Sequence, residues 1–489
     1  MEENRKLTLE EKTLKINLES DIYGSFSEIG AGQEVVANFF RAGGSSGTIA
    51  FSRSAYDMKV SDSIYGKAPR YVSEERLRTM LNHEYDVVLR SLEHRKDYTR
   101  FFAFCNTVES LNFHKTNQGQ GWIGIRFQKR PNTQPNNIIL HVKMHDQSNH
   151  AQQEALGILG VNLIYATYFK IDEDLDEFVD TLVHTLPKDR IEIDMLNVEG
   201  PDFEHFDNRM LALTLVKKGI TEATMFDQTG RVLQPTDELY KKSILLIRGR
   251  FRPVTKVNID MLESARERFY QEKGVEKENA REIFELTLRD LTSDGKIAEK
   301  DFIDRTELLG ALGYTVMISN YLKYYEVVDY LSEVSRNYKI GVLLGIYNLN
   351  NIFNEAHYTD LNGGILEAFG KGFGRNSKLY IYPAINYKTG ELYEFKNYKI
   401  PENLKGLLQF MIDNDKIEGL TKFEYDLLKI NSDEVLEKIQ THQDDETWDN
   451  DVPERVAKAI KFMRLFGYKP KVEPEPLKLS KEKKSPRTS

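Results

Sequence analysis

Cysteine is nearly absent from this sequence, and so are long apolar runs. Cys105 is the only cysteine, so the chain can form neither an internal disulfide nor a cluster of thiolate metal ligands. Because Cys105 stands in an apolar run, we interpret it as a small core residue rather than a nucleophile. No stretch approaches the roughly 18 apolar residues that cross a bilayer, and the chain opens on charged residues rather than on the apolar core of a signal peptide. We therefore expect a cytoplasmic protein without membrane contact.

An excess of basic residues is also missing. The net charge is -9, which argues against nucleic-acid binding through a broadly basic surface. With 489 residues, of which 40% are hydrophobic and 29% charged, the chain is typical of a globular protein with one to three domains. The sequence does not determine an oligomeric state.

Short apolar runs recur after residue 137, and many are followed by a helical pattern. This alternation predicts an α/β fold with a mainly parallel sheet. Eight candidate strands would also suit a closed βα barrel, but we favour an open, doubly wound sheet. The eight runs are residues 138–142, 161–165, 191–196, 223–226, 244–247, 315–318, 340–344 and 379–382.

Composition divides the chain into four regions. The lead-in of about 20 residues alternates apolar and charged side chains, which predicts an exposed strand or irregular structure. A loop rich in helix and strand breakers at 129–137 indicates a boundary. We expect an N-terminal α+β region with glycine-rich turns at 1–135, an α/β domain at 136–385, a helical C-terminal region at 386–470 and a disordered tail at 471–489.

Two glycine-rich turns near the N-terminus are the first candidate site. Glycine allows tight turns that expose N–H groups, and a following helix adds partial positive charge, so such turns can hold phosphate. Neither turn completes the dinucleotide or P-loop fingerprint, and tight loop geometry without a ligand is the alternative. The candidate phosphate-binding residues are Gly30 and Gly32 in the first turn, and Gly43, Gly44, Ser45, Ser46, Gly47 and Thr48 in the second.

Three arginines follow the strand expected at 244–247. They would lie at its carboxyl end, where α/β proteins bind ligands. In an extended chain, alternation would point Arg248, Arg250 and Arg252 to one side. Three guanidinium groups together favour a phosphate or carboxylate ligand, and the alternative is a set of surface arginines paired with acids.

The segment 225–232 resembles the nucleophile motif of the haloacid dehalogenase superfamily, and 308–320 resembles its second motif. The resemblance implies that Asp227 is the attacked carboxylate and that Ser319 binds phosphate. Thr229 stands where the phosphatases of that superfamily carry an acid. The alternative is a surface turn, since Asp and Gly both favour turns.

Acids and histidines offer weaker candidates. Asp194, inside the strand expected at 191–196, could bind magnesium or act as a base. The alternative is that it caps a helix or pairs with an arginine such as Arg209. His141 and His145 are four residues apart, a spacing that forms a metal-binding face only on a helix. Because His141 lies in a predicted strand, we expect no metal site there.

Four segments together resemble a bacterial family of about this length: 21–36, 54–57, 153–163 and 248–253. The resemblance extends from residue 14 to Tyr468. Some members carry the name nicotinate-nucleotide adenylyltransferase and others a TonB-dependent receptor label. The name implies a nucleotide ligand, but the Gly-x-Phe-x-Pro-x-His signature of that enzyme class is absent, so no catalytic residues carry over.

We therefore expect an enzyme that acts on a nucleotide or phosphorylated metabolite, with Mg²⁺ and ATP as candidate cofactors. Adenylyl transfer to nicotinate mononucleotide is the most specific version and rests on the family name alone. The alternatives are phosphoryl transfer at Asp227 and a non-catalytic regulatory or scaffold protein.

Overall fold

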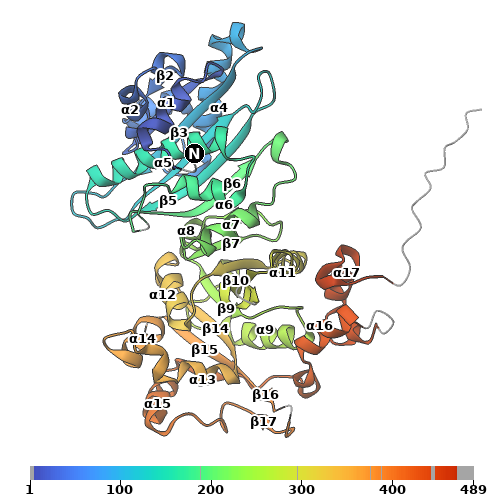
Figure 1. The fold of residues 1–489 in the computed structure, drawn as a ribbon. Coiled ribbons are helices and arrows are strands. Elements are labelled where there is room, and N and C mark those ends of the chain that lie inside the picture. Colours follow the sequence, from blue (N-terminus) through green and yellow to red (C-terminus); the bar gives the residue numbers. More distant parts are fainter. Residues whose placement is uncertain are drawn as a thin grey trace, which may run out of the picture.

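The computed structural model describes residues 5–187, 189–293, 296–374, 376–386, 388–441 and 446–470. Two large sheets occupy the upper and lower halves of the molecule (Figure 1). Helices alternate with strands, and the lower sheet is open and largely parallel. The predicted α/β class is thus confirmed. The tail predicted at 471–489 lies outside the described residues.

The upper sheet has the strand order β2-β1-β3-β4-β5-β6. β1 pairs parallel with β2 and β3, and the remaining pairs are antiparallel. The breaker-rich loop that predicts a domain boundary connects β4 and β5, which are hydrogen-bonded neighbours, so this sheet continues to residue 199. Its strands are β1 (Ile22–Gly30), β2 (Ile49–Arg53), β3 (Arg100–Glu109), β4 (Gly119–Phe127), β5 (Asn136–Met144) and β6 (Ile191–Glu199).

Helices cover both faces of the upper sheet. One face packs on α1 (Leu9–Asn17), α2 (Glu34–Ala42), α5 (Asn149–Phe169) and α6 (Leu175–Leu182). The other packs on α4 (Glu74–Ser91), which follows α3 (Met58–Tyr65).

Two expectations for this half were wrong. The run 161–165 lies in α5, whose apolar residues surround the helix because α1, α2, α6 and the sheet enclose it. The lead-in forms α1, which begins with a capping box at Thr8.

The lower sheet has the order β18-β15-β14-β9-β10-β13-β7-β8. Counted from β9, the six parallel strands run 3-2-1-4-5-6 across the sheet, which is the doubly wound order that reverses between the first and fourth strands. The strands are β7 (Ala223–Phe226), β8 (Val232–Leu233), β9 (Ser243–Arg248), β10 (Ala280–Thr287), β13 (Thr315–Ser319), β14 (Ile340–Gly345), β15 (Ser377–Tyr382) and β18 (Ile417–Gly419). The two remaining pairs, β11 (Thr292–Ser293) with β12 (Lys296–Ile297) and β16 (Ala384–Ile385) with β17 (Leu392–Tyr393), form separate ribbons.

Helices also cover both faces of the lower sheet. Its first face packs on α9 (Lys256–Phe269), α11 (Glu299–Ala311), α16 (Ser432–Thr441) and α17 (Glu454–Met463). The second packs on α12 (Tyr324–Val334), α13 (Leu349–Ile352), α14 (Gly364–Phe373) and α15 (Lys405–Asp413). The short helices α8 (Pro235–Leu239) and α10 (Leu288–Leu291) follow β8 and β10.

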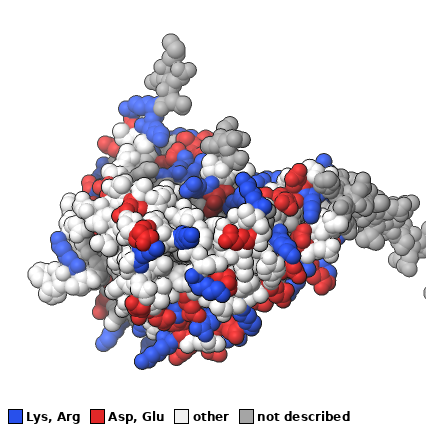
Figure 2. Space-filling view, turned by 90° about the horizontal axis from the view of Figure 1, so that it is seen from below, with Lys and Arg blue, Asp and Glu red and all other residues white. Residues whose placement is uncertain are grey.

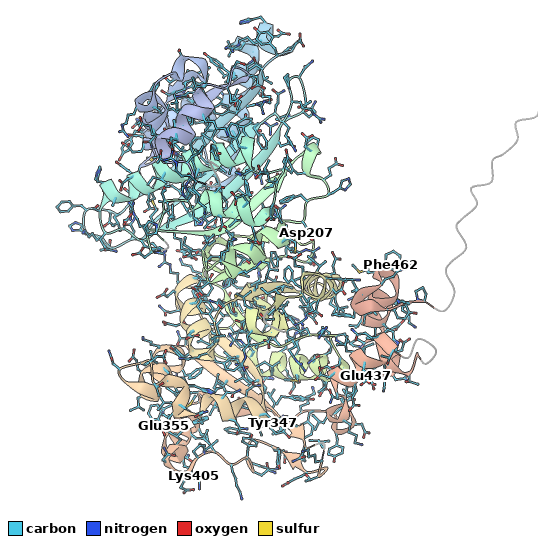
Figure 3. All side chains as sticks on the ribbon, viewed as in Figure 1. Asp207, Tyr347, Glu355, Lys405, Glu437 and Phe462 are labelled. Carbon is cyan, nitrogen blue, oxygen red and sulfur yellow. The ribbon has the colours of Figure 1, made fainter. Side chains whose placement is uncertain are left out.

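The two halves share one apolar core at their junction. Helix α7 (Asn208–Lys217) contributes Leu211 and Leu215 to the core of the upper sheet, and Ala212 and Val216 to a cluster that continues into the lower sheet. Its N-cap, Asp207, marks this junction in Figure 3. Among the described residues, no helix is long and apolar enough to cross a membrane.

Candidate functional site

A cleft of about 710 Å³ lies at the carboxyl edge of the lower sheet. Its walls come from the loops that follow four parallel strands: 248–250 after β9, 287–290 after β10, 322–324 after β13 and 348–360 after β14. The strand order reverses between β9 and β14, and open α/β sheets bind their ligands at such a switch point. The topology alone therefore marks this cleft as the candidate site.

A buried ion pair supports the base of the cleft. The Arg248 guanidinium donates hydrogen bonds of 2.7 Å from Nε and Nη2 to the two carboxylate oxygens of Glu285. The Ser319 hydroxyl donates to the same carboxylate at 2.5 Å. Burial alone would lower the pKa of Arg248, but the attraction of Glu285 and its hydrogen bonds raise the pKa overall. Arg248 thus stays charged beneath the cleft.

Tyr324 holds Arg248 from the other side. The Arg248 guanidinium lies 4.7 Å from the centroid of the Tyr324 ring, a cation–π contact. The Tyr324 hydroxyl donates a hydrogen bond of 3.1 Å to Oδ1 of Asn348, and burial raises the pKa of Tyr324. These contacts fix the orientation of Arg248 relative to the loop after β14.

Cations surround the mouth of the cleft. Arg250 pairs with Asp433 at 2.7 Å and Lys323 with Asp360 at 2.7 Å, and in each pair at least one partner is well exposed. Arg289 is exposed, and its guanidinium makes no hydrogen bond or ion pair with any residue that the structure describes. The N-terminus of α12 opens on the same cleft at Tyr324 and adds partial positive charge. The cleft therefore suits an anionic ligand.

The three predicted arginines do not form one cluster. Arg248 and Arg250 both line the cleft, but each arginine takes a different acid: Glu285, Asp433 and, for Arg252, Asp301. The chain leaves the extended conformation after β9, with a positive φ of 47° at Phe251. Strand alternation therefore does not continue through the three positions.

The first glycine turn is filled by a side chain of the protein itself. The Glu28 carboxylate accepts hydrogen bonds from the N–H of Val35 (3.2 Å) and of Val36 (3.1 Å) in the first turn of α2. These are the N–H groups that would hold a phosphate at this helix. Gly30 has a φ of 81°, and the carbonyl of Gly32 accepts a bond from Asn106. The turn serves the packing of the β1–α2 corner.

The second glycine turn ends α2 and leads into β2. The carbonyl of Gly43 accepts a hydrogen bond of 2.7 Å from Asn17 of α1. Gly44 has a φ of 72°, and residues 45–47 form a single 3₁₀ turn before Thr48. A chain leaving a helix at such positive φ favours glycine. The hydroxyl-bearing residues Ser45 and Ser46 are in this short turn.

The structure does not bring the glycine turns and the arginines together. The turns lie beside α2 and β2 at the top of the molecule (Figure 1), whereas Tyr347 and Glu355, from the loop after β14, lie in its lower half (Figure 3). No residue of either turn lines the cleft of Arg248. A single phosphate site built from both is therefore not present.

Asp227 lies in the turn between β7 and β8. Its Oδ1 accepts hydrogen bonds from the backbone N–H groups of Thr229 (2.8 Å) and Arg231 (3.1 Å), as in a side-chain-closed turn. Because β7 is antiparallel to β13, Ser319 pairs with Ala223 at the far end of β7. The two residues of the haloacid dehalogenase resemblance thus lie at opposite edges of the sheet.

Asp194 lies fully buried between the two halves. It accepts hydrogen bonds from His141 at 2.6 Å, from Gln234 at 3.1 Å and from Lys143 at 3.3 Å. Burial alone would raise the pKa of Asp194, but the charges of His141 and Lys143 lower it well below its usual range. These partners place Asp194 at the junction, whereas Arg209 pairs with Asp207 and Glu307.

No group of three or more His, Cys, Asp or Glu side chains within the described ranges could hold a metal ion. The cleft does fit a nucleotide such as ATP in size and charge, since small-molecule sites span roughly 300–1,000 Å³.

Sequence reasoning missed Arg289, Lys323 and the loop 348–360. The strand that leads to Arg289, β10, carries three charged residues, Arg281, Glu282 and Glu285, so its sequence lacks the apolar run of the other buried strands. Had β10 been placed, its carboxyl end would have pointed to Arg289.

No protein-family model and no curated protein matches the chain, so the bacterial family resemblance stays a prediction. Part of the fold is similar to solved structures. One is the competence/damage inducible protein CihA from Agrobacterium tumefaciens, with 15% identity over 33% of this chain and 98% of that chain, and a TM-score of 0.24. A competence-damaged protein (CinA) superfamily member from Enterobacter cloacae gives 10% identity over 34% of this chain and 96% of that chain, again with a TM-score of 0.24. Similarity at this level does not identify a function.

Proposed function

We propose that the protein is an enzyme that binds a nucleotide or another phosphorylated metabolite in the cleft at the carboxyl edge of the lower sheet. The observation that carries this proposal is the set of cations at the switch point: Arg248 beneath the cleft, and Arg250, Arg289 and Lys323 at its walls. Arg289 is the first phosphate ligand, because no acid of the described chain neutralises it.

The ion pairs of the cleft's cations support a ligand that carries phosphate. Arg250 and Lys323 are held by exposed acids, so a phosphate can replace Asp433 or Asp360 at little cost. Arg248 is held by buried Glu285 and would keep its place. The cleft thus offers one fixed cation and three that can close on a phosphate.

The outer surface supports the same reading. On the face seen from below, basic and acidic side chains are interspersed (Figure 2). A strand of nucleic acid is held by a continuous basic surface, whereas a single phosphorylated metabolite needs only the local cations of the cleft. We therefore expect a small-molecule ligand.

Adenylyl transfer to nicotinate mononucleotide is the most specific form of this proposal. Its support is the sequence resemblance, together with a cleft large enough for a nucleotide. ATP would place its phosphates on Arg289, Arg250 and Lys323, and these residues would orient the phosphates. Any magnesium would be bound chiefly by the nucleotide.

Calorimetric titration with ATP, nicotinate mononucleotide and inorganic phosphate tests the proposal. We expect saturable binding of at least one nucleotide and weaker binding of phosphate. Absence of heat for both nucleotides, with a folded protein, would overturn it. Binding without any turnover of the bound nucleotide would instead favour a non-catalytic regulatory protein.

A further inference from the structure

A second, smaller cavity of about 130 Å³ lies in the upper half, on the face covered by α1, α5 and α6. The start of the chain closes one side of it with Arg5 and Lys6, and α5 contributes Tyr165. This cavity shares no residue with the cleft of the lower sheet.

A buried lysine forms part of its wall. Lys12 of α1 is only 3% exposed. Its ammonium donates hydrogen bonds to Oδ1 of Asn162 (2.7 Å) and to Nδ1 of His184 (3.0 Å). Both partners are neutral acceptors, so no carboxylate of the described chain neutralises this buried charge. Buried lysines are rarely left without a counter-ion, and this one lines a cavity.

The other charges around the cavity are also mainly basic. Lys6 and Arg5 lie at its opening, where Arg5 pairs with Glu11. Lys170 follows α5 and pairs with Glu173. The two acids of the lining are paired: Glu177 with Lys170 at 3.4 Å and Asp180 with Lys218 at 2.9 Å. The missing counter-ion of Lys12 is therefore not supplied by its neighbours.

We propose that this cavity binds a small oxyanion, phosphate or a short carboxylate, with the Lys12 ammonium as its central donor. An ammonium has three N–H groups, of which Asn162 and His184 take two. The third is left for an anion in the cavity, beside the Tyr165 ring, whose centroid lies 5.5 Å from the ammonium. Lys6 provides a second positive charge nearby. The volume, equal to a few water molecules at about 30 Å³ each, limits the ligand to a small ion.

A change in the protonation of Lys12 would be an independent sign of anion binding. Burial, assisted by repulsion from Lys6, lowers the pKa of Lys12 to about 8. Burial, assisted by the charges of Lys12 and Lys6, also lowers the pKa of His184. A bound anion favours the charged ammonium, so it raises the pKa of Lys12 and binding is accompanied by proton uptake above pH 8.

Acetylation of the folded, full-length protein tests the proposal. The rate at Lys12 is measured by mass spectrometry with inorganic phosphate, with acetate, or with sodium chloride at the same ionic strength. Exposed Lys15, on the same helix, is the internal reference. We expect phosphate or acetate to slow acetylation of Lys12 severalfold while Lys15 is unchanged. Equal rates at Lys12 in all three salts would overturn the proposal.

A variant supplies the second arm. Lys12→Met keeps the length and apolar stem of the side chain but removes the donor, and Lys15→Met is the matched control. In calorimetry, we expect Lys12→Met to bind the protecting anion at least about tenfold more weakly. Unchanged affinity in folded Lys12→Met would overturn the proposal. If that variant fails to fold, the acetylation rates of the wild type decide whether the proposal holds. Neither experiment depends on ligand binding in the lower cleft.

Discussion

Arg248 donates two hydrogen bonds of 2.7 Å to Glu285, at the point where β9 and β10 end. Glu285 is fully buried, and the Arg248 side chain is 7% exposed. A buried charge of this kind persists only when its partner is present. The pair therefore fixes the Arg248 guanidinium beneath the cleft, with its charge balanced by Glu285.

Glu285→Gln should leave that charge without its partner. We expect the free energy of unfolding to fall by about 3 kcal/mol, because breaking a buried ion pair leaves the other charge uncompensated. Urea unfolding measures the loss. Glu282→Gln, on the same strand, breaks the more exposed pair with Arg266 and should cost clearly less; equal losses would contradict the central place of the Arg248–Glu285 pair.

Arg289→Ala should weaken ligand binding without lowering the stability of the protein. Arg289 is exposed and unpaired within the described residues, so its removal leaves the folded structure intact. We expect about a tenfold loss of nucleotide affinity, the effect of one charged hydrogen bond, and an unchanged melting temperature. Arg455→Ala removes an exposed arginine of α17, away from the cleft, and should change neither quantity.

The sequence predicts the class of the fold and its open sheet, because buried parallel strands appear in the sequence as short apolar runs. It also places Arg248 at the end of a strand, as found. It does not predict the partners of Arg248, Arg250 and Arg252, because the acids that separate them lie 37, 183 and 49 residues away. The charged strand β10 and the apolar helix α5 escape local prediction for the same reason. Contacts with segments distant in the sequence bury them, and their local patterns do not show this.

Glu28→Gln should change the pH dependence of stability. Burial raises the pKa of Glu28 to about 8, although N–H groups of Val36 and Val35 oppose the shift. The folded state then keeps a proton that the unfolded state loses above its ordinary pKa of 4.5. The wild type should therefore lose stability as pH rises from about 5 to about 8, by roughly 1 kcal/mol per pH unit.

Urea unfolding at several pH values checks this dependence. In Glu28→Gln the corresponding slope should be absent, while Glu34→Gln, which removes the smallest cause of the shift, should keep most of it. An identical slope in Glu28→Gln and the wild type would show that another group is responsible.

Asp227→Ala should lower the stability of the protein but leave nucleotide turnover unchanged. The carboxylate closes the β7–β8 turn through the N–H groups of Thr229 and Arg231, so we expect a loss of about 1 kcal/mol in the free energy of unfolding. Nucleotide turnover at saturating substrate should be unchanged. A turnover reduced a thousandfold in the folded variant would restore Asp227 as a nucleophile.

Hydrogen–deuterium exchange with and without the nucleotide found by calorimetry tests the central claim most directly, because it locates the ligand on the unmodified protein. The cleft account predicts slower exchange in the segments 286–291, 320–326 and 346–360, which surround the cleft. It predicts no change at 28–36 and 42–50, where the glycine turns lie. Protection confined to those glycine turns, with the cleft segments unaffected, would contradict the account.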